Sequence, residues 1–565
     1  MKKSVLLVFL IALQAMMPLQ AQEDYQHSVQ QILHDRGEVY FSFELPDEGA
    51  SKKLLTILGR SISIDRVDNR KVYAYANQKG WRDFLTHSLS FTILDAPSTL
   101  LSPSRLNRIG EKKSGSWDYY PSYDEYLSDM QGFQDHYPQL CELVNIGKTT
   151  EGRDLLFIHF KPSDSLVSKP QVMYTATMHG DETLPYVLML ELIDDLLKNY
   201  PHDPKVGLLL DSLDIWINPL ANPDGTYASG NASVSGAHRF NANGVDLNRN
   251  FPDPDQGNHP DGNAWQPETK AFMDFSANHH FVLSVNMHTG NEVANYPWDT
   301  WSRRHADDGW WQKVCRQYAD TVQFYSTDSH YFTDLNNGIT NGYDWYRVAG
   351  GRQDYMNYFD HCREFTLEMS KVKMPAADLI PDFWAWNRRA LLDYMAQALT
   401  GIHGLVIDSL SREPVAAKIF VIDHDTDHSE VYSALPYGDF YRFIMPGTYS
   451  LLVSREGYQS KRIDHVEVKA GKKTSLKIAL TPLKTGIGKQ QYPLLKIYPN
   501  PAREYIRCSF PGSINAWEIV DINHRKIVSG ERLPKRIGVS KWPAGWYFLR
   551  IQSNRHWHSQ SFSVR

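Results

Sequence analysis

Cysteine is scarce in this sequence. The chain of 565 residues has four, at Cys141, Cys315, Cys362 and Cys508. Small secreted domains that depend on disulfides carry far more cysteine in far fewer residues, so a disulfide framework is excluded. A single bridge between Cys315 and Cys362 is compatible with the sequence, and free buried thiols are an equally good interpretation.

An excess of charge of one sign is also absent. The sequence has 59 basic and 65 acidic residues, for a net charge of -6, and the two signs are well mixed. Proteins that bind nucleic acid neutralise its phosphates with clustered lysine and arginine. We therefore expect no nucleic acid among the partners of this protein.

Long apolar runs are missing as well. A membrane-spanning helix needs about 20 apolar residues, and the run at residues 5–13 is too short. That run follows Met1-Lys2-Lys3 and precedes Leu19-Gln20-Ala21, the order typical of a secretory signal peptide. We expect residues 1–21 to be removed and the mature chain to have no transmembrane segment.

The rest of the sequence predicts four domains, since its length exceeds what one hydrophobic core supports. Residues 22–112 read as a small α+β module without concentrated chemistry. Residues 113–400 alternate buried strands with helices, which predicts an α/β domain whose mixed, mostly parallel central sheet is flanked by helices. Residues 401–481 and 495–565 predict two all-β sandwich domains, joined by a linker at 482–494.

A His-x-x-Glu pair follows one predicted strand of the α/β domain. His179 and Glu182 come after the apolar run at 172–177, and imidazole and carboxylate are good zinc ligands. The sequence has a second such pair, His361 and Glu364, so spacing alone does not select the first. His288 follows another predicted strand, and sites in parallel sheets lie at the carboxyl ends of strands. These positions predict a metal site of His179, Glu182 and His288.

If the predicted metal site hydrolyses the ends of peptides, it also needs a carboxylate that takes a proton from water and groups that bind the terminal carboxylate of the substrate. In the predicted strand at 364–369, Glu368 lies at the carboxyl end, whereas Glu364 lies at the opposite end, roughly 13 Å away. Glu368 is therefore the predicted base. Arginine binds a terminal carboxylate best, and Asn248 and Arg249 stand side by side with Arg239 close before them.

Together these motifs identify a family. In order and spacing, the sequence from about 120 to 400 resembles the M14 zinc carboxypeptidases, in particular their N/E, or regulatory, subfamily. The motifs that carry the resemblance are His179-x-x-Glu182, Asn222-Pro223-Asp224-Gly225, Arg239, Asp246-Leu247-Asn248-Arg249, His288, the segment 342–354 and Thr366-Leu367-Glu368.

The resemblance implies one Zn²⁺ ion, bound by His179, Glu182 and His288, the ligand types also used by carboxypeptidase A. It implies that the C-terminal peptide bond of a peptide or protein is hydrolysed by a zinc-activated water. Glu368 would be the general base and acid, and Arg239 would polarise the scissile carbonyl.

The resemblance also assigns the substrate-binding residues. Asn248 and Arg249 would hold the terminal carboxylate, and Tyr346 would cap the bound substrate. Asp299, eleven residues after His288, matches the acidic residue at the base of the specificity pocket.

Gln353 matches the polar companion of that acid, so we expect release of C-terminal Lys and Arg, because an apolar side chain would leave the Asp299 carboxylate unpaired. Arg352 departs from the subfamily, which usually has Met there. If it pointed into the pocket it would repel basic side chains or pair with Asp299.

The flanking domains show resemblances of their own. Residues 401–480 resemble the transthyretin-like module of this subfamily. The last segment, with Tyr498-Pro499-Asn500-Pro501 and Pro543-Ala544-Gly545-Trp546-Tyr547, resembles the C-terminal sorting domain of type IX secretion. That resemblance implies the secretion machinery as a partner and a secreted or cell-surface location. The N-terminal module is a candidate propeptide, with Lys112-Lys113 a candidate processing site.

Two alternatives remain open at this point. The same site could act on bacterial cell-wall peptides. The chain could also be a surface-binding protein with an inactive peptidase domain, which the presence of every required group disfavours.

Overall fold

The computed structural model describes residues 29–46, 48–106, 117–161, 168–483, 495–510, 513–522, 525–553 and 556–565. The predicted signal peptide, the candidate processing site and most of the linker lie outside these ranges. The chain divides into two compact units, one ending at Pro482 and the other beginning at Leu483. Each unit is described by itself.

The centre of the first unit is an eight-stranded sheet in the order β11-β10-β12-β9-β7-β8-β6-β5. Four neighbouring pairs are parallel, β10 with β11, β12 with β9, β9 with β7 and β7 with β8. The other three pairs are antiparallel, so the prediction of a mixed, mostly parallel sheet is confirmed. The strands are β5 (Cys141–Lys148), β6 (Asp154–Phe160), β7 (Gln171–Ala176), β8 (Asp214–Asn218), β9 (Phe281–His288), β10 (Asn291–Tyr296), β11 (Ile339–Asn341) and β12 (Arg363–Ser370).

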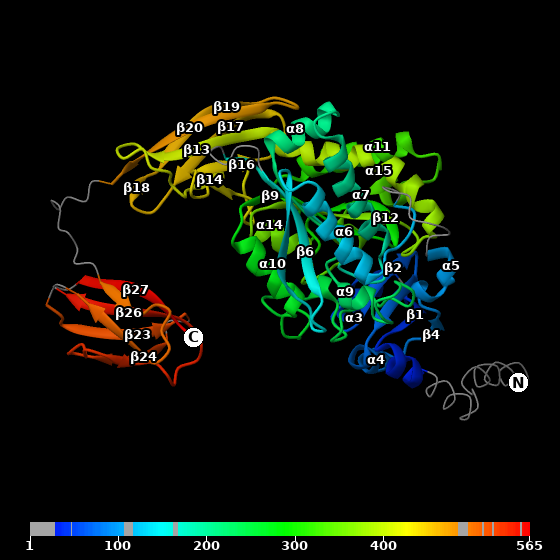
Figure 1. The fold of residues 1–565 in the computed structure, drawn as a ribbon, viewed down its shortest axis with the longest axis horizontal. Coiled ribbons are helices and arrows are strands. Elements are labelled where there is room, and N and C mark those ends of the chain that lie inside the picture. The colour runs from blue at the N-terminus through cyan, green and yellow to red at the C-terminus, as the bar shows by residue number, and fades with distance from the viewer. Residues whose placement is uncertain are drawn as a thin grey trace, which may run out of the picture. The chain divides into compact units, whose positions relative to one another are not determined.

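Helices cover both faces of this sheet (Figure 1). Residues from α6, α7, α11 and α15 share one hydrophobic core with the strands, while α10 and α14 contribute to a second core. Helix α7 is buried on nearly all sides, as its run of leucine, isoleucine and methionine predicts. The helices are α5 (Pro103–Leu106), α6 (Tyr123–His136), α7 (Leu184–Asn199), α8 (Pro204–Ser212), α9 (Pro223–Thr226), α10 (Pro267–Ala277), α11 (Asp308–Tyr325), α12 (Asp334–Gly338), α13 (Gly342–Trp345), α14 (Arg352–Tyr358) and α15 (Ile380–Met395).

The N-terminal module is an antiparallel four-stranded sheet in the order β2-β3-β1-β4. It has its own core, in which Phe41, Trp81 and Phe84 pack together. Strand β2 lies at the edge of the sheet. The elements are β1 (Val39–Glu44), α3 (Glu48–Leu58), β2 (Ser63–Asp68), β3 (Lys71–Ala76), α4 (Gln78–Leu85) and β4 (Phe91–Leu94).

A β-sandwich completes the first unit, and a second all-β domain forms the other unit. The sandwich packs the sheet β16-β13-β20-β18 against the sheet β15-β14-β17-β19. Its strands are β13 (Gly401–Asp408), β14 (Lys418–Val421), β15 (Val431–Tyr432), β16 (Asp439–Arg442), β17 (Gly447–Ser454), β18 (Tyr458–Gln459), β19 (Lys461–Val468) and β20 (Lys473–Pro482). The second unit contains β21 (Lys496–Tyr498), β22 (Tyr505–Ser509), β23 (Ala516–Asp521), β24 (Lys526–Gly530), β25 (Ile537–Gly538), β26 (Gly545–Ser553) and β27 (His556–Val564).

A buried ionic cluster joins the sandwich to the α/β domain. Asp307, just before α11, is fully buried and receives two hydrogen bonds of 2.8 Å from Arg442 of β16. Arg363 of β12 and His424 also lie 2.8 Å from its carboxylate. Because a buried carboxylate requires such partners, these contacts tie the two domains into one folded unit.

All four cysteines are free thiols, so the bridge between Cys315 and Cys362 does not form in this structure. Within the described ranges, every helix is too short or too polar to span a bilayer.

Candidate active site

Three side chains converge where β7 and β9 end. His179 and Glu182 lie in the turn between β7 and α7, and His288 is the last residue of β9. His179 Nδ1 lies 2.9 Å from Glu182 Oε1, and His288 Nδ1 lies 2.8 Å from Glu182 Oε2. Their potential ligand atoms all fall within 4.8 Å of one another. The parallel pairing of β7 with β9 thus brings together residues that are far apart in sequence.

The chemistry of this group fits a zinc ion. Two imidazole nitrogens and a carboxylate are zinc donors, and three protein ligands leave a position for water or substrate. Burial lowers the pKa of His288 to about 4, which keeps the ring in the neutral form that binds metals. Burial opposes ionisation of Glu182, but the positive charge of Lys373 holds the pKa of this carboxyl well below the usual range.

Asp246 orients His179, a role that the sequence did not assign. Its Oδ1 lies 2.9 Å from Nε2 of His179, so this nitrogen carries the proton and leaves Nδ1 free to face the metal position. Asp246 also accepts a hydrogen bond from the backbone N–H of Asn248. The sequence contained a signal for this residue, because Asp246 is the first residue of the motif that also contains Asn248 and Arg249.

Glu368 lies beside the three candidate ligands. Strands β12 and β9 are parallel and in register, and they place Glu368 opposite His288. Burial, together with the nearby charge of Glu182, raises the pKa of Glu368 well above its usual range. The other His-x-x-Glu pair is not a metal site, because His361 faces the carbonyl of His428 while Glu364 binds Arg352.

Three of the four predicted substrate-binding residues, Asn248, Arg249 and Asp299, line the same small cavity, of about 30 Å³. Arg239 is buried, and its Nη1 lies 3.0 Å from Glu182 Oε1. Asn248 and Arg249 lie on a short 3-10 turn, Leu247–Arg249, in which Arg249 donates to the backbone carbonyl of Asn248. Tyr346 lines the same cavity.

Asp299 and Gln353 meet at one end of the cavity. Gln353 Nε2 donates to Asp299 Oδ1 at 3.1 Å, and Asn295 donates to the same oxygen. Burial raises the pKa of Asp299 to about 6. A Cβ atom at Gly342 would overlap the Asp299 carboxylate, so only glycine leaves this acid room.

Arg352 points away from this end of the cavity. Its guanidinium is buried and makes a two-pronged ion pair with Glu364, with distances of 3.0 Å from Nε to Oε1 and 2.8 Å from Nη2 to Oε2. Ser284 donates to the same carboxylate. The guanidinium therefore pairs with Glu364 rather than with Asp299, and it does not enter the pocket, where it could repel a basic substrate.

Comparison with known proteins decides the family. Three family models match, a zinc carboxypeptidase over residues 126–390, a carboxypeptidase regulatory-like domain over 401–481 and a secretion system C-terminal sorting domain over 496–565. Carboxypeptidase M of Mus musculus is 35% identical over 345 residues, which cover 59% of this chain and 77% of that protein. The chain belongs to the zinc carboxypeptidase family.

Two further comparisons concern the length of a relative and the fold of a solved structure. Carboxypeptidase D of Mus musculus is 34% identical over 355 residues, 60% of this chain but only 25% of that longer protein. The chain therefore matches about a quarter of that relative's length. The crystal structure of carboxypeptidase A from Helicoverpa armigera has a TM-score of 0.51 and 18% identity, and covers 64% of this chain and 97% of that one. It shows a shared fold, which confirms the predicted fold class.

The N-terminal module contacts residues of this cavity. Ser63 Oγ donates to Asp246 and accepts from Arg239 Nε at 2.6 Å. Asp65 lines the cavity together with the candidate ligands. Sequence reasoning did not find this contact, because the register that brings β2 to the cavity is a tertiary feature with no local sequence signal.

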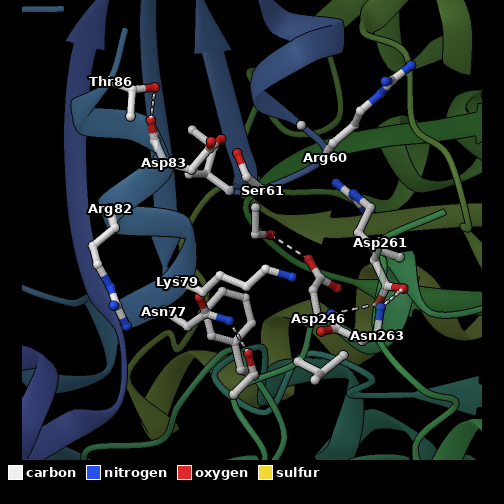
Figure 2. A pocket seen from close by; sticks show the side chains of 17 residues that line it. Arg60, Ser61, Asn77, Lys79, Arg82, Asp83, Thr86, Asp246, Asp261 and Asn263 are labelled. Atoms are coloured by element: carbon white, nitrogen blue, oxygen red, sulfur yellow. Dashed lines mark hydrogen bonds between the residues drawn. The ribbon is translucent and has the colours of Figure 1, made fainter. Parts of the chain in front are cut away.

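A larger cavity, of about 590 Å³, lies next to the site between the module and the α/β domain. Figure 2 shows Asn77 and Lys79 on the module side, and Asp246, Asp261 and Asn263 on the other. Asn77 donates to the backbone carbonyl of Gly244 at 2.7 Å. Since Arg249 lines both cavities, the module forms one wall beside the predicted carboxylate clamp.

Lys373 is a further site residue that the sequence did not suggest. Its side chain is buried, and Nζ lies 2.6 Å from Glu182 Oε1 and 2.8 Å from Asp65 Oδ1. A charged lysine is almost never buried without partners. The α/β domain, through Glu182, and the N-terminal module, through Asp65, therefore each supply a carboxylate to this ammonium group.

Proposed function

We propose that this protein is a secreted zinc metallocarboxypeptidase that releases C-terminal Lys and Arg from peptides and proteins. The observation that carries the specificity is the buried Asp299 carboxylate at the end of a cavity whose other lining residues include Arg249. A carboxylate there pairs with a cationic side chain. An apolar side chain would leave it unpaired, at a cost of about 1 to 3 kcal/mol.

The chain's own residues have distinct tasks in this proposal. Arg249 and Asn248 bind the terminal carboxylate and so select exopeptidase cleavage. Arg239 donates to the scissile carbonyl oxygen as negative charge develops there. Glu368 accepts a proton from the attacking water and delivers it to the leaving amine.

His179, Glu182 and His288 would hold the zinc ion, which when bound lowers the pKa of water and polarises a carbonyl. Asp246 would keep His179 in the tautomer that such binding requires. Tyr346 would close over the bound substrate.

The sorting domain supports delivery out of the cell. A secretion system C-terminal sorting domain matches residues 496–565, and we infer that the secretion machinery is a partner and that the protein is secreted or held at the cell surface.

A terminal-residue assay tests the activity and its specificity. Peptides that differ only in a terminal Lys, Arg, Leu or Glu are incubated with the protein, with and without a chelator. We expect chelator-sensitive release of Lys and Arg at least about tenfold faster than release of Leu. Equal or faster release of Leu would contradict the specificity, and no release of any residue would indicate an inactive peptidase domain.

The variant Asp299→Asn refines the assay. It keeps the size of the side chain and its hydrogen bonds but removes the charge, so release of Lys should slow by about tenfold or more while release of Leu changes little. The variant Asp261→Asn is a matched control, since this partly buried acid lies in the neighbouring cavity rather than in the pocket.

A further inference from the structure

A stretch of the N-terminal module lies against active-site residues as an extended peptide. The edge strand β2 pairs with β3 on one side, and its first three residues meet site residues on the other. Ser63 Oγ accepts from Arg239 Nε. The backbone carbonyl of Ile64 accepts a hydrogen bond of 3.4 Å from the hydroxyl of Tyr346.

The third residue of this stretch, Asp65, places its carboxylate beside two cationic side chains of the α/β domain. Its carboxylate lies 2.8 Å from Lys373 Nζ and 3.4 Å from Arg239 Nη1, and it also accepts from the hydroxyl of Tyr40. Two cations on one carboxylate form a strong, charge-assisted contact. Both cations belong to the α/β domain, so that domain presents an anion-binding position.

Lys373 is held firmly at this position. Its backbone carbonyl accepts hydrogen bonds from Thr183 N and from Thr289 Oγ1, which follow the candidate ligands Glu182 and His288. An ammonium group has three N–H donors. Within the α/β domain it contacts Glu182 Oε1, and Asp181 lies 3.6 Å away, which leaves donor capacity for a carboxylate that enters from the cleft.

We propose that Lys373 and Arg239 form an anion subsite for the substrate. The subsite takes the side-chain carboxylate of an Asp or Glu that directly precedes the terminal residue, and Asp65 is its internal occupant. The inference rests on the proposed function, to which it adds a second selected position in the peptide. Substrates that end in Glu-Lys or Asp-Arg are then preferred over those with a neutral residue before the terminal one.

The test uses the full chain loaded with zinc and carrying Asp65→Ala, which vacates the subsite. Two peptides that end in Glu-Lys or Gln-Lys are compared, both as substrates and as analogues whose last amide is replaced by a non-hydrolysable methyleneamine. We expect the Glu form to have a kcat/KM about tenfold higher, and the Glu analogue to bind about tenfold more tightly by calorimetry.

A second substitution assigns the effect to Lys373. In the Asp65→Ala background, Lys373→Met should bring the two peptides to equal kcat/KM and equal affinity, and Lys373→Arg should keep the selectivity. Lys371→Met is the matched control, because this half-exposed lysine two residues away pairs with Glu292 and Asp334 instead. It should leave the tenfold ratio unchanged.

The outcomes separate the two proposals. Equal affinity for the Glu and Gln analogues in Asp65→Ala, or no binding of either, overturns the subsite whatever the activity. Selectivity that survives Lys373→Met overturns it as well. Selective binding of the Glu analogue without hydrolysis of any peptide keeps the subsite and overturns the proposed activity.

Discussion

The two rings of the candidate metal group are held in different ways. His179 has Asp246 on one nitrogen and the metal position on the other, whereas Nε2 of His288 has no hydrogen-bond partner among the described residues. A ring with a carboxylate behind it is a stronger and better oriented ligand. Loss of Asp246 is therefore expected to weaken metal binding without removing a ligand.

Glu368 gives the sharpest prediction at the scale of one residue. Glu368→Gln removes the proton acceptor but keeps the shape, so kcat/KM for the preferred peptide should fall by about 10²- to 10⁴-fold. Zinc content, measured by metal analysis, should stay near one ion per chain. A variant that retains more than a tenth of the activity would assign the base to another group.

The Asp299 carboxylate predicts a pH dependence. Its folded-state pKa is raised to about 6 by burial, so the pocket carries its negative charge above pH 6 and loses it as the pH falls below 6. The ratio of kcat/KM for terminal Lys to that for terminal Leu should therefore drop between pH 7 and pH 5. In Asp299→Asn the ratio should be low and flat over this range.

At the scale of elements, strand ends explain what the sequence could predict. His288 and Glu368 end or nearly end neighbouring parallel strands, so the pattern of apolar runs was enough to bring them together. The direction of Arg352 could not be predicted in this way. It depends on how α14 packs on β12, where the buried Glu364 binds the guanidinium and holds it away from the pocket.

The ion pair of Arg352 with Glu364 links α14 to β12 and should matter for stability. Arg352→Met leaves a buried carboxylate without its partner, at an expected cost of about 3 to 5 kcal/mol in the free energy of unfolding, measured by urea denaturation. Arg352→Met combined with Glu364→Gln should recover part of the loss.

The substrate preference of these two variants serves as the control for the stability measurement. Since Arg352 faces away from Asp299, the preference for terminal Lys over Leu should be unchanged in the folded fraction of either variant. A change of more than threefold would mean that this arginine reaches the pocket.

At the scale of the whole molecule, three described regions of the first unit contact one another. The central sheet carries the candidate ligands, the N-terminal module brings Ser63 and Asp65 to site residues, and the sandwich contacts Asp307 of the α/β domain through Arg442 and His424. Sequence reasoning found each of the three as a separate region. It missed the contacts between them, because Asp65, Lys373 and Asp307 have partners that are remote in sequence.

The domain contact predicts a contrast between two arginines. Arg442→Met removes the arginine that forms a bidentate ion pair with the fully buried Asp307. The free energy of unfolding of the first unit, measured by thermal or urea unfolding, should fall by about 3 to 5 kcal/mol. Arg303→Met also removes a two-pronged pair with the sandwich, to Asp427, but that arginine is half exposed. Its loss should cost less than about 1 kcal/mol, and similar costs for both would contradict the role of burial.

The burial of Asp307 also bears on how such a chain can be inherited. A peptidase domain that ended near residue 400 would keep this acid and lose Arg442 and His424, so a gene that recombined at that seam would encode a charge with too few partners. We therefore expect the sandwich and the α/β domain of this chain to be inherited together. The boundary at Pro482 lies instead between two compact units, and we expect recombination there to cost the first unit none of the partners of Asp307.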